Sequence, residues 1–226
     1  MRTGTLSVLF NNDRLMPIYS VDVPDKRIAL TFDAGWGSYY TRNILETLNR
    51  YDVKATFFVT GSWAERYPDI VSEIAESGCE IGNHSLTHPR MVGMAKKVAA
   101  SEIKEAEAKI AKITGKGTKL FRAPFGEYDS DLSALVRNMG YTMIQWDVDS
   151  LDWKGMDKKA IYENVISNVH NGSIILFHNN ALPSCEVLGD IIEKLRSDGY
   201  RFNIVSELLI KDNYYIDNSG KQRSLE

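Results

Sequence analysis

The stretch Arg27-Ile28-Ala29-Leu30-Thr31-Phe32 is a mostly apolar run, and the chain then enters a loop that contains Gly35 and Gly37. A short apolar run bounded by glycines is typical of a buried strand that ends in a turn. The segment Ala55-Thr56-Phe57-Phe58-Val59 has the same character, and its aromatic and β-branched residues favour a second buried strand. The sequence therefore predicts a protein built around buried strands.

Helical and strand-like segments alternate along nearly the whole chain. The clearest helix covers 96–113, is followed by Gly115, and has an apolar stripe of Val98, Ile103, Ala106, Ile110 and Ile113. Further helices are predicted near 40–50, 68–77, 130–138, 157–169 and 186–197, and further strands at 80–82, 119–122, 141–146, 173–177 and 201–205. This alternation without a linker predicts one α/β domain around a parallel sheet, either open or closed into a barrel.

The two ends of the chain differ from this alternating middle. Residues 1–25 are rich in turn-forming residues and are interpreted as an N-terminal arm or short edge strands. Residues 26–210 form the predicted domain, and the polar tail 211–226 is expected to be mobile.

Composition excludes several classes of function. The 226 residues are 43% hydrophobic and carry a net charge of -3, so the chain lacks the basic surface expected of a nucleic-acid-binding protein. No apolar run is long enough to cross a bilayer. The apolar segment Leu6–Phe10 is too short for a secretory signal, although a processed or truncated chain would look the same.

Unusual polar residues follow the predicted strands at their carboxyl ends. In parallel α/β folds the loops at these ends usually hold the functional site, and closure of a barrel would gather them at one mouth. The residues concerned are Asp33, His84, His88, Arg122, Asp149, Asp152 and His178.

The two histidines in Asn83-His84-Ser85-Leu86-Thr87-His88 are four residues apart. On a helical turn this spacing places both imidazoles on one face, where they could share a metal ion. The alternative is a pair of surface or capping histidines near the turn before Pro89. Glutamate does not follow the first histidine, so the helical motif of zinc proteases is absent.

The remaining polar residues each have a catalytic and a structural interpretation. Asp33 could be a general base or could bind backbone amides of the next helix. Arg122 could hold a carboxylate through two parallel hydrogen bonds or form a surface ion pair. His178 could act as an acid tuned by a carboxylate or cap the loop that follows it. Trp153, beside Asp149 and Asp152, could mark a sugar subsite or be ordinary packing.

Taken in order, these residues form motifs that resemble the polysaccharide deacetylases of the NodB homology type, also called carbohydrate esterase family 4. The resemblance runs from about Arg27 to Leu209. The five motifs are Thr31-Phe32-Asp33-Ala34-Gly35, His84-Ser85-Leu86-Thr87-His88, Arg122-Ala123-Pro124-Phe125, Asp149-Ser150-Leu151-Asp152-Trp153 and Leu176-Phe177-His178. Within the family, the chain looks most similar to bacterial sporulation-type peptidoglycan deacetylases.

The resemblance implies a distorted (β/α) barrel and a metal-dependent hydrolysis of N-acetyl groups on peptidoglycan or a chitin-like glycan. It implies that His84 and His88 bind a divalent metal, zinc or else cobalt or nickel. The implied catalytic residues are Asp33 as base, Arg122 orienting it, and His178 as acid, with Asp152 or Asp149 tuning that acid and Asp152 favoured. The implied substrate and oxyanion contacts come from Phe125, Trp153, Leu176 and Asp149. The family's polymers imply action outside the cell or in its envelope.

Two positions depart from the family pattern. Phe125 replaces a tyrosine and keeps its backbone N–H. Ala34 stands where the family has an aspartate that completes the metal triad, so the predicted metal site is incomplete. Ala34 motivates a different hypothesis, a non-catalytic glycan-binding relative that has lost full metal binding. An esterase that removes O-acetyl groups from xylan is a third hypothesis.

Overall fold

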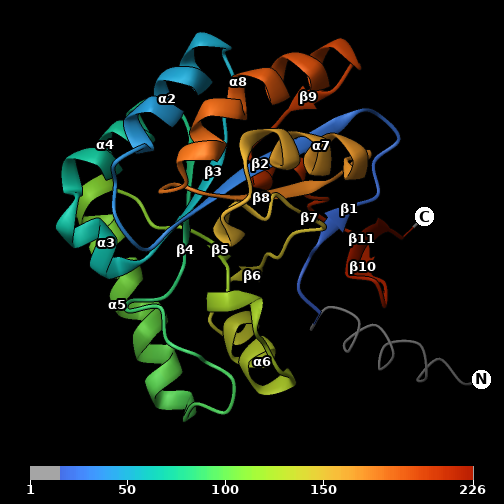
Figure 1. Cartoon of the computed structure of the whole chain (residues 1–226). Coiled ribbons are helices and arrows are strands. Elements are labelled where there is room, and N and C mark those ends of the chain that lie inside the picture. Colours follow the sequence, from blue (N-terminus) through green and yellow to red (C-terminus); the bar gives the residue numbers. More distant parts are fainter. Residues whose placement is uncertain (1–15, 226) are drawn as a thin grey trace, which may run out of the picture.

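The computed structural model describes residues 16–225 and shows a curled parallel sheet with helices on its outside (Figure 1). The strands lie in the order β6-β5-β4-β3-β2-β8-β7, and β9 pairs with β2 at one end. Their bounds are β2 Arg27–Ala34, β3 Thr56–Val59, β4 Glu80–Asn83, β5 Leu120–Phe121, β6 Thr142–Met143, β7 Val148–Asp149, β8 Ile174–His178 and β9 Arg201–Phe202. The predicted distorted (β/α) barrel is confirmed.

Helices cover the outer face of this sheet because the strands direct alternate side chains outward. Leu30 and Phe32 of β2 belong to the main hydrophobic core, where Phe32 stacks on Phe57 and Phe177 of the neighbouring strands. The helices are α2 Thr41–Arg50, α3 Gly61–Arg66, α4 Pro68–Glu76, α5 Lys96–Thr114, α6 Ser130–Asn138, α7 Lys158–Asn168, α8 Leu182–Ser197 and α9 Val205–Leu208. No helix among residues 16–225 has the length and apolar character that a membrane span requires.

The segment before β2 lies along the gap between the two edges of the sheet. Ile18 donates its N–H to Met143 of β6 at 2.9 Å, and its carbonyl accepts from Gln145 at 2.7 Å. Further along, the N–H of Val21 in β1 (Ser20–Val21) donates to the carbonyl of Gly172 at 3.0 Å. The segment therefore links β6, at one edge of the sheet, to the residues that precede β8, the strand next to the other edge. The remainder of the expected arm, residues 1–15, lies outside the described residues.

The expectation of a mobile polar tail was wrong for the described residues after Lys211. They form a hairpin of β10 (Tyr214–Ile216) and β11 (Lys221–Ser224), and β11 pairs with β1 in parallel. The polar Gln222 is buried because its side-chain amide donates to the Ile210 carbonyl and accepts from the Ile210 N–H, both at 2.9 Å. A polar residue such as Gln222 can therefore be buried through contacts with a residue that is distant in the sequence, which the local composition of the tail does not indicate.

Smaller differences concern element boundaries and one helix face. Val98 is exposed, and the buried face of α5 is formed by Ala99, Ile103, Ala106 and Ile110, whose four-three-four spacing keeps one orientation. The helix α3 and the strand β7 were not predicted, and α8 begins at Leu182 rather than near 186. The strand predicted at 141–146 ends at Met143 as β6, so Asp149 and Asp152 belong to the carboxyl end of β7 and not to that strand.

Candidate active site

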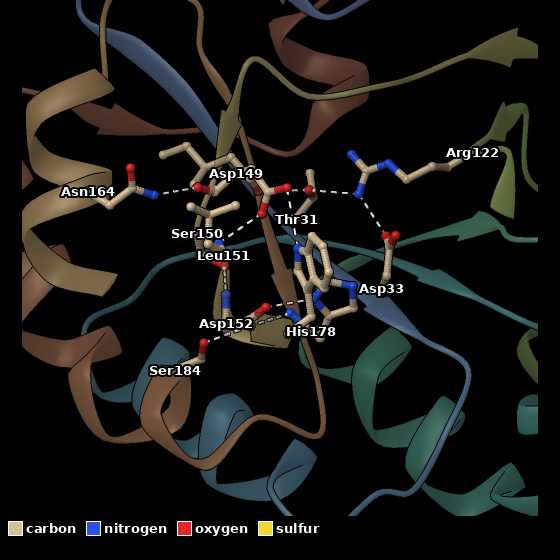
Figure 2. A network of polar contacts seen from close by, with 12 residues as sticks. Thr31, Asp33, Arg122, Asp149, Ser150, Leu151, Asp152, Asn164, His178 and Ser184 are labelled. Carbon is tan, nitrogen blue, oxygen red and sulfur yellow. Dashed lines mark hydrogen bonds and ion pairs between the residues drawn. The ribbon is translucent and has the colours of Figure 1, made fainter. Parts of the chain in front are cut away.

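The site is built from cross-strand rows at the carboxyl end of the barrel. Asp33 at the end of β2 and His178 at the end of β8 are register partners on adjacent parallel strands. Register partners in neighbouring strands point to the same face, so the two side chains lie side by side at the mouth (Figure 2). One step deeper, Leu176 pairs with Thr31 on one side and with Asp149 on the other.

Asp33 is held by Arg122, which follows β5 and is fully buried. Arg122 Nη1 donates to Asp33 Oδ1 at 2.7 Å and to Thr31 Oγ1 at 2.9 Å, while Nη2 donates to the Gln145 carbonyl at 3.0 Å. A single bond to the carboxylate replaces the two parallel bonds expected from sequence. Burial alone would raise the pKa of Asp33, but the charge of Arg122 and its hydrogen bond oppose burial, and the pKa lies below its ordinary value.

Gly82 leaves space for the Phe58 ring, which packs against the guanidinium of Arg122. The guanidinium carbon of Arg122 lies 4.1 Å from the centre of the Phe58 ring, an aromatic contact that favours a cation. Phe58 pairs with Gly82 across β3 and β4. A Cβ atom at position 82 would lie 2.5 Å from the Phe58 ring, so only glycine leaves that ring in place. The requirement for Gly82 had no local signal in the sequence.

His84 and His88 come together on a strained loop and not on the helical turn that was expected. Ser85 and His88 have φ values of +67° and +59°, and the two imidazole ring centres are 4.8 Å apart. The loop is fixed from α5, where Glu102 accepts from the N–H groups of Leu86 and Thr87 at 3.0 and 2.9 Å. Sequence reasoning missed Glu102, which lies outside every motif.

His178 is paired with Asp152, as the sequence analysis favoured over Asp149. Its Nδ1 lies 2.7 Å from Asp152 Oδ1, and its backbone N–H donates to Oδ2 at 2.8 Å. The Ser184 hydroxyl also donates to Oδ2, at 2.7 Å. Burial opposes the charged imidazolium, but the hydrogen bond to Asp152 and its charge outweigh burial, so the pKa of His178 is raised. Asp149 instead accepts from the backbone N–H of Leu151 at 2.8 Å.

The predicted substrate contacts lie around this centre. Leu176 is buried, whereas Phe125 and Trp153 are more than half exposed. Phe125 has a φ of +60°, and its ring centre is 4.5 Å from that of His88. Trp36, which was not predicted as a site residue, also contacts His88, at 4.4 Å between ring centres.

Comparison with known proteins identifies the family. Residues 20–144 match the family model described as polysaccharide deacetylase. The chain belongs to this family. It is 37% identical over 189 residues to the peptidoglycan-N-acetylmuramic acid deacetylase PdaC of Bacillus subtilis, covering 84% of this chain and 40% of that protein. It is 36% identical over 179 residues to a peptidoglycan-N-acetylglucosamine deacetylase of Bacillus cereus, covering 77% and 65%. The chain thus spans less than two thirds of either relative.

Among solved structures, this polysaccharide deacetylase is similar to a pseudoenzyme of the same carbohydrate esterase family from Bacillus anthracis. The TM-score is 0.83 at 31% identity, and the match covers 86% of this chain and 69% of the other. The structures it resembles therefore include one described as inactive. Named deacetylases and a pseudoenzyme therefore share this family.

The histidines of this family member fit a divalent metal as two nitrogen ligands. His84 Nδ1 lies 2.9 Å from the Arg122 carbonyl, which can only accept, so Nδ1 carries the proton and Nε2 keeps its lone pair. His88 Nδ1 is buried without a hydrogen-bond partner in the described chain. Burial lowers both pKa values, that of His88 to about 4, which favours the neutral imidazoles that bind metals.

The third protein ligand is not found. Residues 16–225 hold no cluster of three His, Cys, Asp or Glu side chains arranged to bind an ion. Ala34 lies in the hydrophobic core with Phe32 and Val59. Asp33 is the nearest carboxylate, with Oδ2 3.4 Å from His84 Nε2. Position 34, where the family has its third ligand, therefore holds an alanine in an apolar environment.

Proposed function

We propose that this protein hydrolyses N-acetyl groups of peptidoglycan or a related N-acetylated glycan and releases acetate, outside the cell or in its envelope. The observation that carries the proposal is the pairing of Asp33 with Arg122 beside that of His178 with Asp152. The first pairing favours an ionised carboxylate, and the second favours a protonated imidazole. Two adjacent groups held in opposite protonation states suit a base and an acid acting on one bond.

The reaction follows from these two states. Asp33 accepts a proton from a water molecule as the water oxygen forms a bond to the acetamide carbon. His178 donates its proton to the amide nitrogen as the carbon–nitrogen bond breaks, which leaves acetate and a free amine on the sugar. Arg122 keeps Asp33 charged and oriented, and Asp152 does the same for His178. Loss of either partner would change the protonation state on which the step depends.

The metal and the outer residues complete the proposal. A divalent ion held by His84 and His88, zinc or else cobalt or nickel, would polarise the acetamide carbonyl when bound. The backbone N–H of Phe125 is assigned to the developing oxyanion. Leu176 is assigned to the acetyl methyl group, and Trp153, with Asp149 beside it, to a sugar ring.

A non-catalytic glycan-binding protein is the second candidate. The apolar setting of Ala34 favours it, as does the likeness to a pseudoenzyme. Two imidazoles without a carboxylate hold a metal less tightly than a full triad. In this alternative the mouth would bind glycan without cleaving the amide.

Acetate release separates the two candidates. Purified peptidoglycan would be incubated with the protein alone and with added zinc, cobalt or nickel, and acetylated xylan would test the esterase hypothesis. We expect acetate from peptidoglycan with metal, and a loss of about 100-fold or more in His178→Ala. His170→Ala is the matched control, because His170 also pairs with an aspartate, Asp147 at 2.9 Å, but precedes β8 at the opposite end of that strand. Absence of acetate under every condition would refute the catalytic proposal.

A further inference from the structure

Exposed apolar side chains are concentrated at the mouth of the barrel. Within residues 16–225, seven large hydrophobic side chains are exposed. Six of them lie in segments that directly follow the carboxyl ends of strands, namely Trp36, Tyr39, Val92, Phe125, Trp153 and Leu182, whereas Val98 lies on α5. Exposed apolar groups gathered beside a site commonly mark a binding surface. This surface is continuous with the candidate active site, because Trp36 and Phe125 both contact His88.

The loop that carries Trp36 is fixed by buried side chains. The Gly37 carbonyl accepts from the indole Nε1 of Trp63 at 2.6 Å and from Asn179 Nδ2 at 3.1 Å. Both donors are buried, and Asn179 also donates to Thr41 Oγ1 at 2.9 Å. Trp36 is nevertheless 57% exposed. A rigid loop that presents an indole to solvent is preorganised for a ligand, because little entropy is lost when the ligand binds.

Polar side chains flank this loop at Gly37, the residue that follows Trp36. A Cβ atom at Gly37 would lie 3.5 Å from the Tyr39 ring and 3.8 Å from the Asn180 Cβ, so both side chains flank the loop. Tyr39 is 86% exposed, and Asn180 is also exposed. An apolar ring face beside a phenol and an amide suits a pyranose ring, which has C–H faces and hydroxyl edges.

We propose that Trp36, with Tyr39 and Asn180, forms a sugar-binding subsite for a pyranose ring next to the one that is deacetylated. The proposal rests on the proposed function, since the occupant is a second sugar of the same glycan strand. Trp36 reaches the reaction centre through its contact with His88, and Asn179, the residue after His178, donates to the Gly37 carbonyl of the same loop. The subsite therefore increases the affinity for longer glycan strands and takes no part in the cleavage of the amide bond.

The test compares short and long substrates in one protein. The short substrates would be the single sugars N-acetylglucosamine and N-acetylmuramic acid, and the long substrate an octasaccharide strand in which the two alternate. Binding would be measured by calorimetry, and kcat/KM by acetate release. We expect Trp36→Ala to weaken octasaccharide binding about 3- to 10-fold and to leave binding of the single sugars unchanged. Trp36→Phe should restore most of the octasaccharide preference, and Tyr39→Ala should show a smaller loss.

The ratio of kcat/KM for the long substrate to that for the short substrate distinguishes loss of the subsite from indirect damage to the reaction centre. Damage to His88 by loss of the Trp36 contact would lower kcat/KM equally for both lengths, and an unchanged ratio would overturn the subsite. Val98→Ala is the matched control, since Val98 is exposed but lies away from the mouth, and it should change neither value. Octasaccharide binding that depends on Trp36 without any acetate release would refute the proposed function and support the subsite. Failure of the wild-type protein to prefer the octasaccharide would overturn the subsite alone.

Discussion

Replacement of Arg122 by methionine tests whether the buried ion pair at the mouth behaves as the structure implies. Arg122 is fully buried and Asp33 is 7% exposed, so the substitution leaves a carboxylate inside the barrel without its cation. It also removes hydrogen bonds to Thr31 and Gln145. Breaking a buried pair by removing one partner costs about 3 to 5 kcal/mol, because the remaining charge is uncompensated. We expect Arg122→Met to lower the free energy of unfolding at pH 7 by that amount.

Urea unfolding followed by circular dichroism measures the effect, and an exposed ion pair provides the control. Arg42 forms a two-bond pair with Glu73, but the two side chains are 57% and 40% exposed. Solvent screens such a pair, so Arg42→Met should change the free energy of unfolding by less than about 1 kcal/mol. The slope of the unfolding curve should stay constant in both variants, because neither changes the surface that unfolding exposes.

A second substitution distinguishes charge burial from simple loss of packing. Asp33→Asn combined with Arg122→Met removes the uncompensated charge, so the double variant should be about 1 to 2 kcal/mol more stable than Arg122→Met alone. If Arg122→Met were no more destabilising than Arg42→Met, the electrostatic reasoning would be refuted. The same would hold if the double variant were less stable than Arg122→Met.

Further predictions concern the acid, the loop and the missing ligand. Asp152 raises the folded-state pKa of His178. The pair therefore stabilises the folded protein fully below about pH 6.5, and this stabilisation is lost as pH rises through the folded-state pKa of His178. Asp152→Asn should therefore lower the His178 pKa in an NMR titration and destabilise the protein more at pH 5.5 than at pH 8.5; a constant pKa would contradict this. Glu102→Ala should weaken zinc binding about tenfold by calorimetry, whereas Glu105→Ala, on the same helix, should not. Ala34→Asp should lower the melting temperature of the metal-free protein, and zinc should then raise it more than in wild type; an equal zinc effect would show that position 34 cannot reach the metal.

The strands were predictable from sequence because their signal is local. The apolar stretch 27–32 and the aromatic stretch 55–59 need no distant partner to be read as buried strands. Polar residues at strand ends then followed from the geometry of parallel sheets. For this reason the sequence alone predicts that Asp33 and His178 lie at the same end of the barrel, and their register on adjacent strands agrees with this.

What the sequence did not reveal depends on contacts between distant residues. The geometry of the histidine loop is set by Glu102, more than a dozen residues away, and by backbone torsions that a spacing rule cannot supply. The hairpin after Lys211 was missed because Gln222 is polar yet bonds the buried backbone of Ile210. In each case a polar side chain forms hydrogen bonds to the backbone of a residue that is distant in the sequence.

The distribution of strain favours a working centre over a glycan-binding relic. Six non-glycine residues in the described chain have positive φ values, and four of them, Ser85, His88, Phe125 and Leu151, lie in loops at the mouth. Each such residue costs about 1 to 3 kcal/mol and persists only where its surroundings enforce it. A buried ion pair is likewise weak as a source of stability, and the pair of Arg122 and Asp33 lies at the same mouth. A surface that only stacked on sugars would need its exposed aromatic rings but neither the strained loops nor the buried charges. Their joint presence supports the catalytic proposal, and a metal-binding measurement on the wild type and on Ala34→Asp tests the incomplete ligand set at position 34.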